Sequence, residues 1–275
     1  MVKLETQGIT LTYGEKKVVE DVTFKVMPGE LVGIVGPNGS GKSTIIKALS
    51  RVITPHSGKV LINDQDISQI KRKELSLLIS VVPQTPILPS AFTAFDIVLM
   101  GRNPHLGLLQ YEGSRDIDIT WQAMKQTSTQ YLAERRVGEL SGGEIQCVVI
   151  ARALAQQTQA ILLDEPTANL DISRQIEVLD LIKGQCQRNK LAVMVAMHDL
   201  NLAVHYCDRL LLINNRMIHA EGTPTEVINA ENLEEVYGPG NYVDTHPLSG
   251  LPVVLPKVGK SKNSQFQGDY RNGNA

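Results

Sequence analysis

The sequence predicts an α/β fold with a mixed sheet, an antiparallel β subdomain at the N-terminus and an inserted helical lobe. Apolar and polar residues alternate over residues 2–30, which is typical of paired strands. Short apolar runs and helix-spaced segments then follow one another after residue 30 and again after residue 160. Strand signals are absent at about 85–150. We therefore expect one domain over residues 1–256, with the helical lobe at about 85–150.

Composition restricts the classes of function. The chain has 275 residues, of which 42% are hydrophobic, enough for a sizeable core. A formal net charge of -2 argues against a nucleic-acid partner. Cys147, Cys186 and Cys207 have no metal-ligand or CxxC spacing and suit a reducing cytosol. No signal peptide and no run of roughly 18 apolar residues is expected, so any membrane role would come through a partner.

The first predicted elements are two strands that pair with each other. Their alternating residues are Ile9, Leu11, Tyr13, Val22, Phe24 and Val26. A turn is predicted over Met27–Glu30, and the apolar run Leu31–Val35 predicts a strand that is buried on both faces. A glycine-rich loop follows, and after it apolar residues take helical spacing: Ile45, Ile46, Ala48, Leu49 and Val52.

The middle of the chain carries helix signals. Thr93 followed by Asp96 predicts the start of a helix over Phe95–Met100. Ser114 is predicted to cap another helix, with Ile117, Trp121 and Met124 on one face.

The α/β pattern resumes at residue 160. We expect strands over 160–163, 191–197 and 210–213, and helices over about 173–188 and 200–206. Asn214–Arg216 predicts a hairpin turn, and Thr223–Glu226 predicts a capping box with proline at the first helical position. Gly238 is predicted to end the helical stretch after this box. The polar composition of residues 257–275 predicts a disordered tail.

Residues Gly36–Thr44 match the phosphate-binding pattern GxxxxGK[ST] between a predicted strand and helix. Glycines let backbone N–H groups turn toward a phosphate, and the helix N-terminus favours an anion. We expect Lys42 to reach the β- and γ-phosphates of ATP and the Ser43 hydroxyl to ligate Mg²⁺. The fold is thus predicted to be a P-loop ATPase core, whose nucleotide-binding residues are Gly36, Pro37, Asn38, Gly39, Ser40, Gly41, Lys42, Ser43 and Thr44.

Two further segments suit the same chemistry. The apolar strand after residue 159 ends in Asp164, expected to hold Mg²⁺, and Glu165, expected to polarise the attacking water. Leu140–Glu144 places Ser141 and two glycines before a predicted helix over Glu144–Ala155, which makes a second anion site. One nucleotide does not need two such sites from one chain.

These segments, in this order, resemble the ABC-type ATPase family over about residues 3–240. The resemblance implies that two copies meet head to tail, with each ATP between the loop of one copy and the signature segment of the other. The signature residues are Ser141, Gly142, Gly143 and Glu144. It further implies that Tyr13 stacks on adenine and that Asp171, in the loop from residue 168, crosses the dimer interface.

The resemblance also implies that Gln84 senses Mg²⁺ as a ligand and that His198 contacts the γ-phosphate. The implied catalytic residues are Lys42, Gln84, Glu165 and His198, and the implied metal ligands are Ser43, Gln84 and Asp164. The chain departs from the family at three positions, with Glu144 for a frequent Gln, Cys147 for a basic residue and Asn169 for Ala or Gly. We expect Glu144 to be tolerated, Cys147 to cost no activity and Asn169 to change side-chain contacts only modestly.

Thr93–His105 and His246–Val254 resemble the metal-chelate importer subfamily, which takes up ferric siderophores, haem or cobalamin. That implies a polytopic membrane permease as partner, a substrate-binding protein reached through it, and a place at the cytoplasmic face of the cell membrane. A groove near Gln84–Met100 would receive a coupling helix of the permease.

Two alternatives remain open: an exporter motor, and a soluble ABC ATPase that acts as an assembly scaffold or on nucleic acid. The segment between Lys42 and Ser141 carries no sustained heptads, unlike DNA-repair relatives, and the chain has one phosphate loop, unlike translation relatives.

Overall fold

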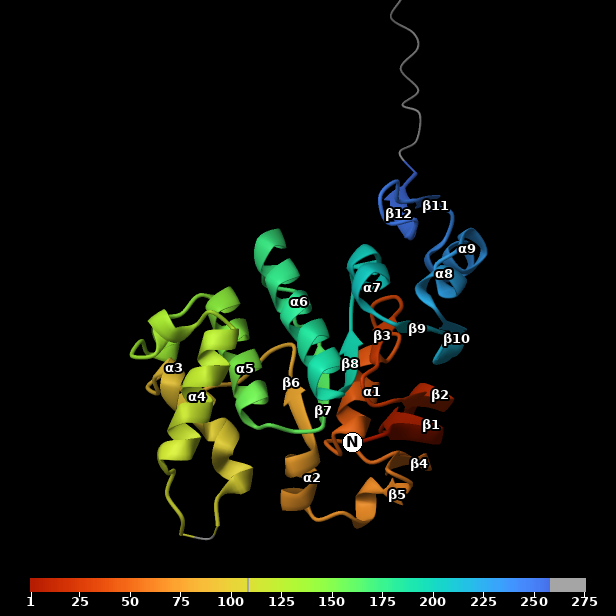
Figure 1. The fold of residues 1–275 in the computed structure, drawn as a ribbon. Helices are drawn as coiled ribbons and strands as arrows, with labels where there is room; N and C mark the ends of the chain where they lie inside the picture. Colours follow the sequence, from red (N-terminus) through yellow and green to blue (C-terminus); the bar gives the residue numbers. More distant parts are fainter. Residues whose placement is uncertain (108, 258–275) are drawn as a thin grey trace, which may run out of the picture.

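The computed structural model describes residues 1–107 and 109–257. The tail predicted from residue 258 onward lies outside the described residues. Two sheets enclose one helix, more helices cover the far face of the larger sheet, and a helical lobe stands to one side (Figure 1). Among the residues that the structure describes, none of the helices has the length and apolar character that a membrane span requires.

The smaller sheet is antiparallel and has the strand order β2-β1-β4-β5. Its strands are β1 (Leu4–Tyr13), β2 (Lys16–Val26), β4 (Ser57–Ile62) and β5 (Gln65–Asp66). The predicted pairing of the first two strands is confirmed, and Ile9 faces Val22 across the ladder. Their alternating apolar side chains are buried except Tyr13, which is half exposed at the end of β1.

The larger sheet has six strands in the order β10-β9-β3-β8-β7-β6. They are β3 (Leu31–Val35), β6 (Ile79–Val82), β7 (Ala160–Asp164), β8 (Ala192–Ala196), β9 (Arg209–Asn214) and β10 (Met217–Gly222). All are parallel except β10, which pairs antiparallel with β9. Asn215 and Arg216 form the predicted hairpin turn with φ of 46° and 74°. The loops after β3, β6, β7 and β8 therefore meet at one edge.

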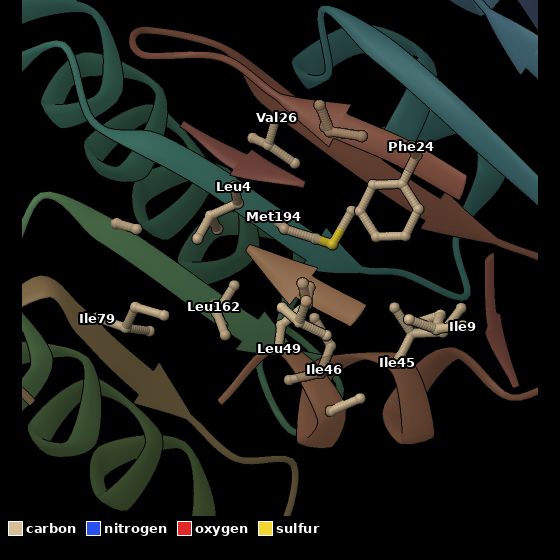
Figure 2. Close-up of a cluster of buried hydrophobic side chains, with 14 of the residues drawn as sticks. Leu4, Ile9, Phe24, Val26, Ile45, Ile46, Leu49, Ile79, Leu162 and Met194 are labelled. Atoms are coloured by element: carbon tan, nitrogen blue, oxygen red, sulfur yellow. The ribbon is translucent and has the colours of Figure 1, made fainter. Parts of the chain in front are cut away.

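Helix α1 (Lys42–Leu49) is enclosed between the sheets. Figure 2 shows Ile45, Ile46 and Leu49 among side chains from both sheets, including Leu162 and Met194. The prediction that Val52 belongs to this helix is wrong. The helix ends at Leu49, Arg51 turns the chain with a φ of 55°, and Val52 is 69% exposed.

The opposite face of the larger sheet is covered by α5 (Gly142–Ala155), α6 (Ile172–Asn189) and α7 (Leu200–Tyr206). Beyond the sheet lie α8 (Pro224–Val227), α9 (Ala230–Tyr237) and the hairpin of β11 (Asn241–Thr245) and β12 (Pro252–Pro256) (Figure 1). The predicted capping box is present at Thr223, whose N–H donates to Glu226 Oε2 at 2.7 Å. Gly238 ends α9 with a φ of 79°, as predicted.

The helical lobe consists of α3 (Ala94–Leu99), η2 (Met100–His105), α4 (Ser114–Gln126), η3 (Gln130–Leu132), η4 (Val137–Glu139) and α5. The remaining short elements are η1 (Ile67–Gln69) and α2 (Arg72–Leu78). Over 83–107 and 109–159 the structure has no strand, as predicted. The capping box of Thr93 and Asp96 is confirmed.

Two predictions for α4 are wrong. Its cap is Gly113, and Ser114 is already helical. The predicted face divides between the core and the surface, because Met124 is fully buried while Ile117 and Trp121 are 40% and 43% exposed. The buried residues of α4 are instead Ile119, Thr120, Ala123 and Met124.

Candidate functional site

The loop after β3 has a backbone that admits glycine alone at two positions. Gly36 and Gly41 have φ of 149° and 105°. A Cβ at Gly36 would lie 2.3 Å from the carbonyl oxygen of Ile213, and one at Gly41 would lie 2.6 Å from Val19 Cγ2. The loop thus lies directly against its neighbours and opens toward the N-terminus of α1.

Lys42 lies inside this loop and is only 4% exposed. Its Nζ donates to the carbonyl oxygens of Gly36 at 2.8 Å and Pro37 at 3.0 Å. Burial lowers the pKa of Lys42, while the nearby Glu165 and Asp164 carboxylates act in the opposite direction. A positive charge is therefore held at the mouth of the loop by backbone oxygens and two acids.

Two carboxylates stand opposite the loop, at the end of β7. Ser43 Oγ donates to Asp164 Oδ1 at 2.8 Å. Burial raises the pKa of Asp164, and the hydrogen bond from Ser43 partly offsets that effect. Neighbouring Glu165 is buried in the left-handed region with a φ of 50°, which is unusual for a residue other than glycine.

The Glu165 carboxylate is held from two sides. Gln84 Nε2, from the loop after β6, donates to its Oε2 at 2.5 Å. His198 Nε2, from the loop after β8, contacts its Oε1. These residues are far apart in the sequence and meet because β6, β7 and β8 are neighbours in the sheet.

A cleft of about 350 Å³, here named the cradle cleft, lies among these groups, although the predicted Gly36, Pro37, Ser40 and Asp164 are not part of its lining. Its lining includes the predicted Asn38, Gly39, Gly41, Lys42, Ser43, Thr44, Gln84, Glu165 and His198. Val18 of β2 also lines it and was not predicted, because no motif surrounds it. Tyr13 stands at the end of the neighbouring strand β1, paired with Lys16 at the start of β2, but does not line the cleft.

The cradle cleft fits a nucleotide phosphate chain with a cation. Ser40 Oγ is buried without a hydrogen-bond partner among the described residues, so the loop holds a donor that lacks an acceptor. Ser43, Asp164 and the amide oxygen of Gln84 are the oxygen ligands that Mg²⁺ prefers. Within the described residues, no group of three or more His, Cys, Asp or Glu side chains offers a metal site of another kind.

A second cleft, here named the signature cleft, lies at the start of α5 and has a volume of about 420 Å³. It is lined by Ser141, Gly142, Gly143 and Glu144 and also by Asn169 and Asp171. Among the described residues, none lines both this cleft and the cradle cleft. The structure therefore brings the predicted phosphate-loop residues together with Gln84, Glu165 and His198. It places the predicted signature residues in a separate cleft.

The signature cleft is organised by helix caps. Ser141 caps α5, which begins at Gly142 and not at Glu144 as predicted. Glu144 Oε2 accepts from the backbone N–H and the hydroxyl of Ser141, both at 2.8 Å, and these bonds lower the pKa of Glu144. Asp171 Oδ1 in turn accepts from the N–H of Arg174 at 2.9 Å and caps α6.

A larger groove, of about 740 Å³, lies where the helical lobe meets the sheet domain and is here named the basic groove. Its lining includes Arg51, Val52, Arg72, Met100 and Arg152. Of the segment Gln84–Met100, where the groove was predicted, only Met100 lines it.

The structure explains part of the Thr93–His105 segment beside this groove. Gly101 lies so close to α5 that a Cβ there would be 2.4 Å from the carbonyl oxygen of Arg152. Arg102 donates to the carbonyl oxygen of Ala155 at 2.7 Å and to Asp116 Oδ1 at 2.9 Å. The segment therefore fixes η2 to the last turn of the helix that the signature residues begin.

Comparison with known proteins agrees with this geometry. The ABC transporter family model matches residues 19–168. An uncharacterized ABC transporter ATP-binding protein of Methanocaldococcus jannaschii is 41% identical, covering 92% of this chain and 97% of the other. A petrobactin import ATP-binding protein of Bacillus anthracis is 36% identical, covering 92% and 93%. A solved structure of a putative metal-chelate type ABC transporter matches with a TM-score of 0.81 and 28% identity over 94% of this chain and 99% of the other.

Proposed function

This chain belongs to the ABC transporter family of ATP-binding proteins, and we propose that it hydrolyses ATP as the motor of a metal-chelate importer. The observation that carries the proposal is the pair of separate clefts, one complete for phosphate and cation and the other a capped helix N-terminus. Relatives named as import ATP-binding proteins for petrobactin, cobalamin and hemin support the class of cargo.

In the cradle cleft, Lys42 and the loop N–H groups would bind the β- and γ-phosphates. Ser43, Asp164 and Gln84 would hold Mg²⁺, which supplies charge neutralisation of the phosphate oxygens when bound. Tyr13 would reach adenine from outside this lining.

Glu165 is the group that would take a proton from the attacking water. Because Gln84 and His198 each contact one of its oxygens, the carboxylate is fixed in direction before nucleotide arrives. Each carboxylate oxygen has two lone pairs, so one of them can accept the proton while the contacts to Gln84 and His198 are kept. His198 would also contact the γ-phosphate.

The signature cleft would complete the site of a second copy. In a head-to-tail dimer, Ser141 and the N–H groups at the start of α5 would face the γ-phosphate held by the partner's loop. Asp171 would cross the same interface from the start of α6. A solved ABC transporter cassette that is dimeric and matches this chain with a TM-score of 0.73 and 28% identity supports this assembly.

A membrane permease would dock in the basic groove. The exposed apolar Val52 and three arginines favour a short helix with an apolar face and acidic residues. That attachment would hold the chain at the cytoplasmic face of the membrane and link it, through the permease, to a substrate-binding protein.

An affinity pull-down from detergent-solubilised membranes of the source tests the transporter role. We expect a polytopic membrane protein to co-purify with the tagged chain and Val52→Arg to weaken its recovery. Met217→Arg is the matched control, because Met217 is 53% exposed and lies on β10 outside the groove lining. Recovery of soluble proteins alone would favour an assembly scaffold and overturn the motor.

A further inference from the structure

An exposed cluster of aromatic side chains lies on the helical lobe, outside the cradle cleft. Phe95 of α3 and Trp121 of α4 have ring centroids 4.9 Å apart and an angle of 43° between their planes. Tyr131 of η3 joins them around a cleft of about 460 Å³, here named the aromatic cleft. Trp121 is 43% exposed and Tyr131 is 63% exposed, although the chain has one tryptophan and few aromatic residues in all.

The charge at the aromatic cleft is negative. Glu134 is the one charged residue among those that line it, and its carboxylate has no hydrogen bond or ion pair with the described residues. The adjacent Arg135 instead donates to Glu144 of α5 and to the carbonyl oxygen of Glu139 in η4. An unpaired acid thus stands beside three aromatic rings.

We infer that the aromatic cleft binds an arginine side chain presented by a partner protein. The faces of aromatic rings attract cations, and a planar guanidinium stacks on them while its edge pairs with a carboxylate. Exposed tryptophan and tyrosine that cluster around a cavity are the residues that dominate protein interfaces. The inference does not rest on the importer role.

Such a partner would also touch the signature cleft. Tyr131 lines both the aromatic cleft and the signature cleft. A side chain that binds in the aromatic cleft against Tyr131 would therefore contact a residue that also lines the signature cleft. The bound partner would therefore regulate the surface through which the second copy of the chain completes the ATP site.

The single tryptophan makes the inference testable in the full chain, because Trp121 reports on the cleft directly. The probe is the peptide acetyl-Gly-Arg-Gly-amide at constant ionic strength, compared with a peptide that carries citrulline, the neutral isostere of arginine. We expect a saturable change of tryptophan fluorescence with the arginine peptide and none with the citrulline peptide. Glu134→Gln should weaken binding by about twofold to fivefold, as loss of one accessible ion pair predicts.

Glu15→Gln is the matched control, because Glu15 is an exposed acid in the turn between β1 and β2, outside the cleft lining. Unchanged ATP affinity of both variants would show that they fold. No saturable response, an equal response to citrulline, or full binding by Glu134→Gln overturns the inference. A response that follows protein concentration instead of peptide would assign the surface to a second copy and overturn it as well.

Discussion

The cradle cleft and the signature cleft differ in how their polar groups are held. At the cradle cleft, Lys42, Asp164 and Glu165 are all less than a tenth exposed, and the two acids contact residues of α1 and of the loops after β6 and β8. In the signature cleft, Ser141 and Glu144 contact each other within one helical turn and remain accessible. One site is fixed by the sheet, whereas the other is a helix end on the lobe.

This difference indicates what each cleft lacks. The cradle cleft has buried charges and a buried donor, Ser40 Oγ, that need a ligand with opposite groups. In the signature cleft, the side chains of Ser141 and Glu144 already hydrogen-bond to each other, so neither needs a phosphate as a partner. The signature cleft would act only when a second copy places a phosphate against it, and the predictions below separate the two contributions.

The largest expected effect is that of Glu165→Gln in the cradle cleft. The amide keeps the shape and the contacts to Gln84 and His198 but cannot take a proton. We expect the rate of ATP hydrolysis to fall by about 10²–10⁴-fold, the usual contribution of a positioned base. ATP binding should persist, and light scattering should detect an ATP-bound dimer that accumulates.

Glu231→Gln is the matched control, since Glu231 is an exposed acid of α9 that lines neither cleft. It should hydrolyse ATP normally. Hydrolysis by Glu165→Gln at near the wild-type rate would show that Glu165 is not the base. Absence of the ATP-bound dimer would contradict the proposal that the two clefts meet in a dimer.

The second prediction concerns the signature cleft. Ser141→Arg should lower ATP hydrolysis by about 10²-fold or more, because a bulky side chain blocks the donors that stabilise the partner's transferring phosphate. Affinity of the monomer for ATP should not change, since Ser141 lies outside the cradle cleft.

Ser141→Ala separates blockage from loss of the helix cap. Both variants lose the cap, which costs about 1 kcal/mol of stability. Only the arginine adds bulk, so the alanine variant should keep more activity. Equal hydrolysis by the arginine variant and the wild type would mean that the signature cleft faces no nucleotide.

Much of the fold was predictable where sharp local signals bound an element. The run Leu31–Val35 ends at a glycine loop, and Thr93 begins a helix with a complete capping box. The pair α2 and β6 was not predicted, because Leu78 passes directly into Ile79 with no turn residue between helix and strand. Without a turn residue, a short apolar run does not show where the hydrophobic pattern changes from the period of a helix to that of a strand.

The site shows the same division. The phosphate loop and its lysine were predictable because their motif is local in the sequence. The contacts of Glu165 with Gln84 and His198 depend on strand order, which no local pattern specifies. The exposure of Trp121 was not predicted either. Periodicity places Trp121 on the same helix as Met124 but does not show which side of that helix is buried.

The smallest expected effect returns to the cradle cleft and concerns its stability without ligand. Burial raises the pKa of Asp164, so the charged carboxylate destabilises the folded chain relative to the neutral form. The neutral carboxyl of Asp164 stabilises the folded chain relative to the charged form. This stabilisation is fully present below the ordinary pKa of an aspartate and is lost as pH rises through the raised pKa. Asp164→Asn should therefore stabilise the Mg²⁺-free chain at pH 7 by about 1 kcal/mol, or about 2–4 °C in Tm.

Thermal unfolding of both proteins at several pH values measures this effect. The gain from Asp164→Asn should shrink as pH falls toward the ordinary pKa of aspartate, because the wild-type carboxyl then becomes neutral as well. With ATP and Mg²⁺ the order should reverse, since only the carboxylate attracts the cation. A gain that does not change with pH would mean that burial of the charge is not its cause. The signature cleft offers the contrast: hydrogen bonds from Ser141 lower the pKa of Glu144, so Glu144→Gln should destabilise the chain at pH 7.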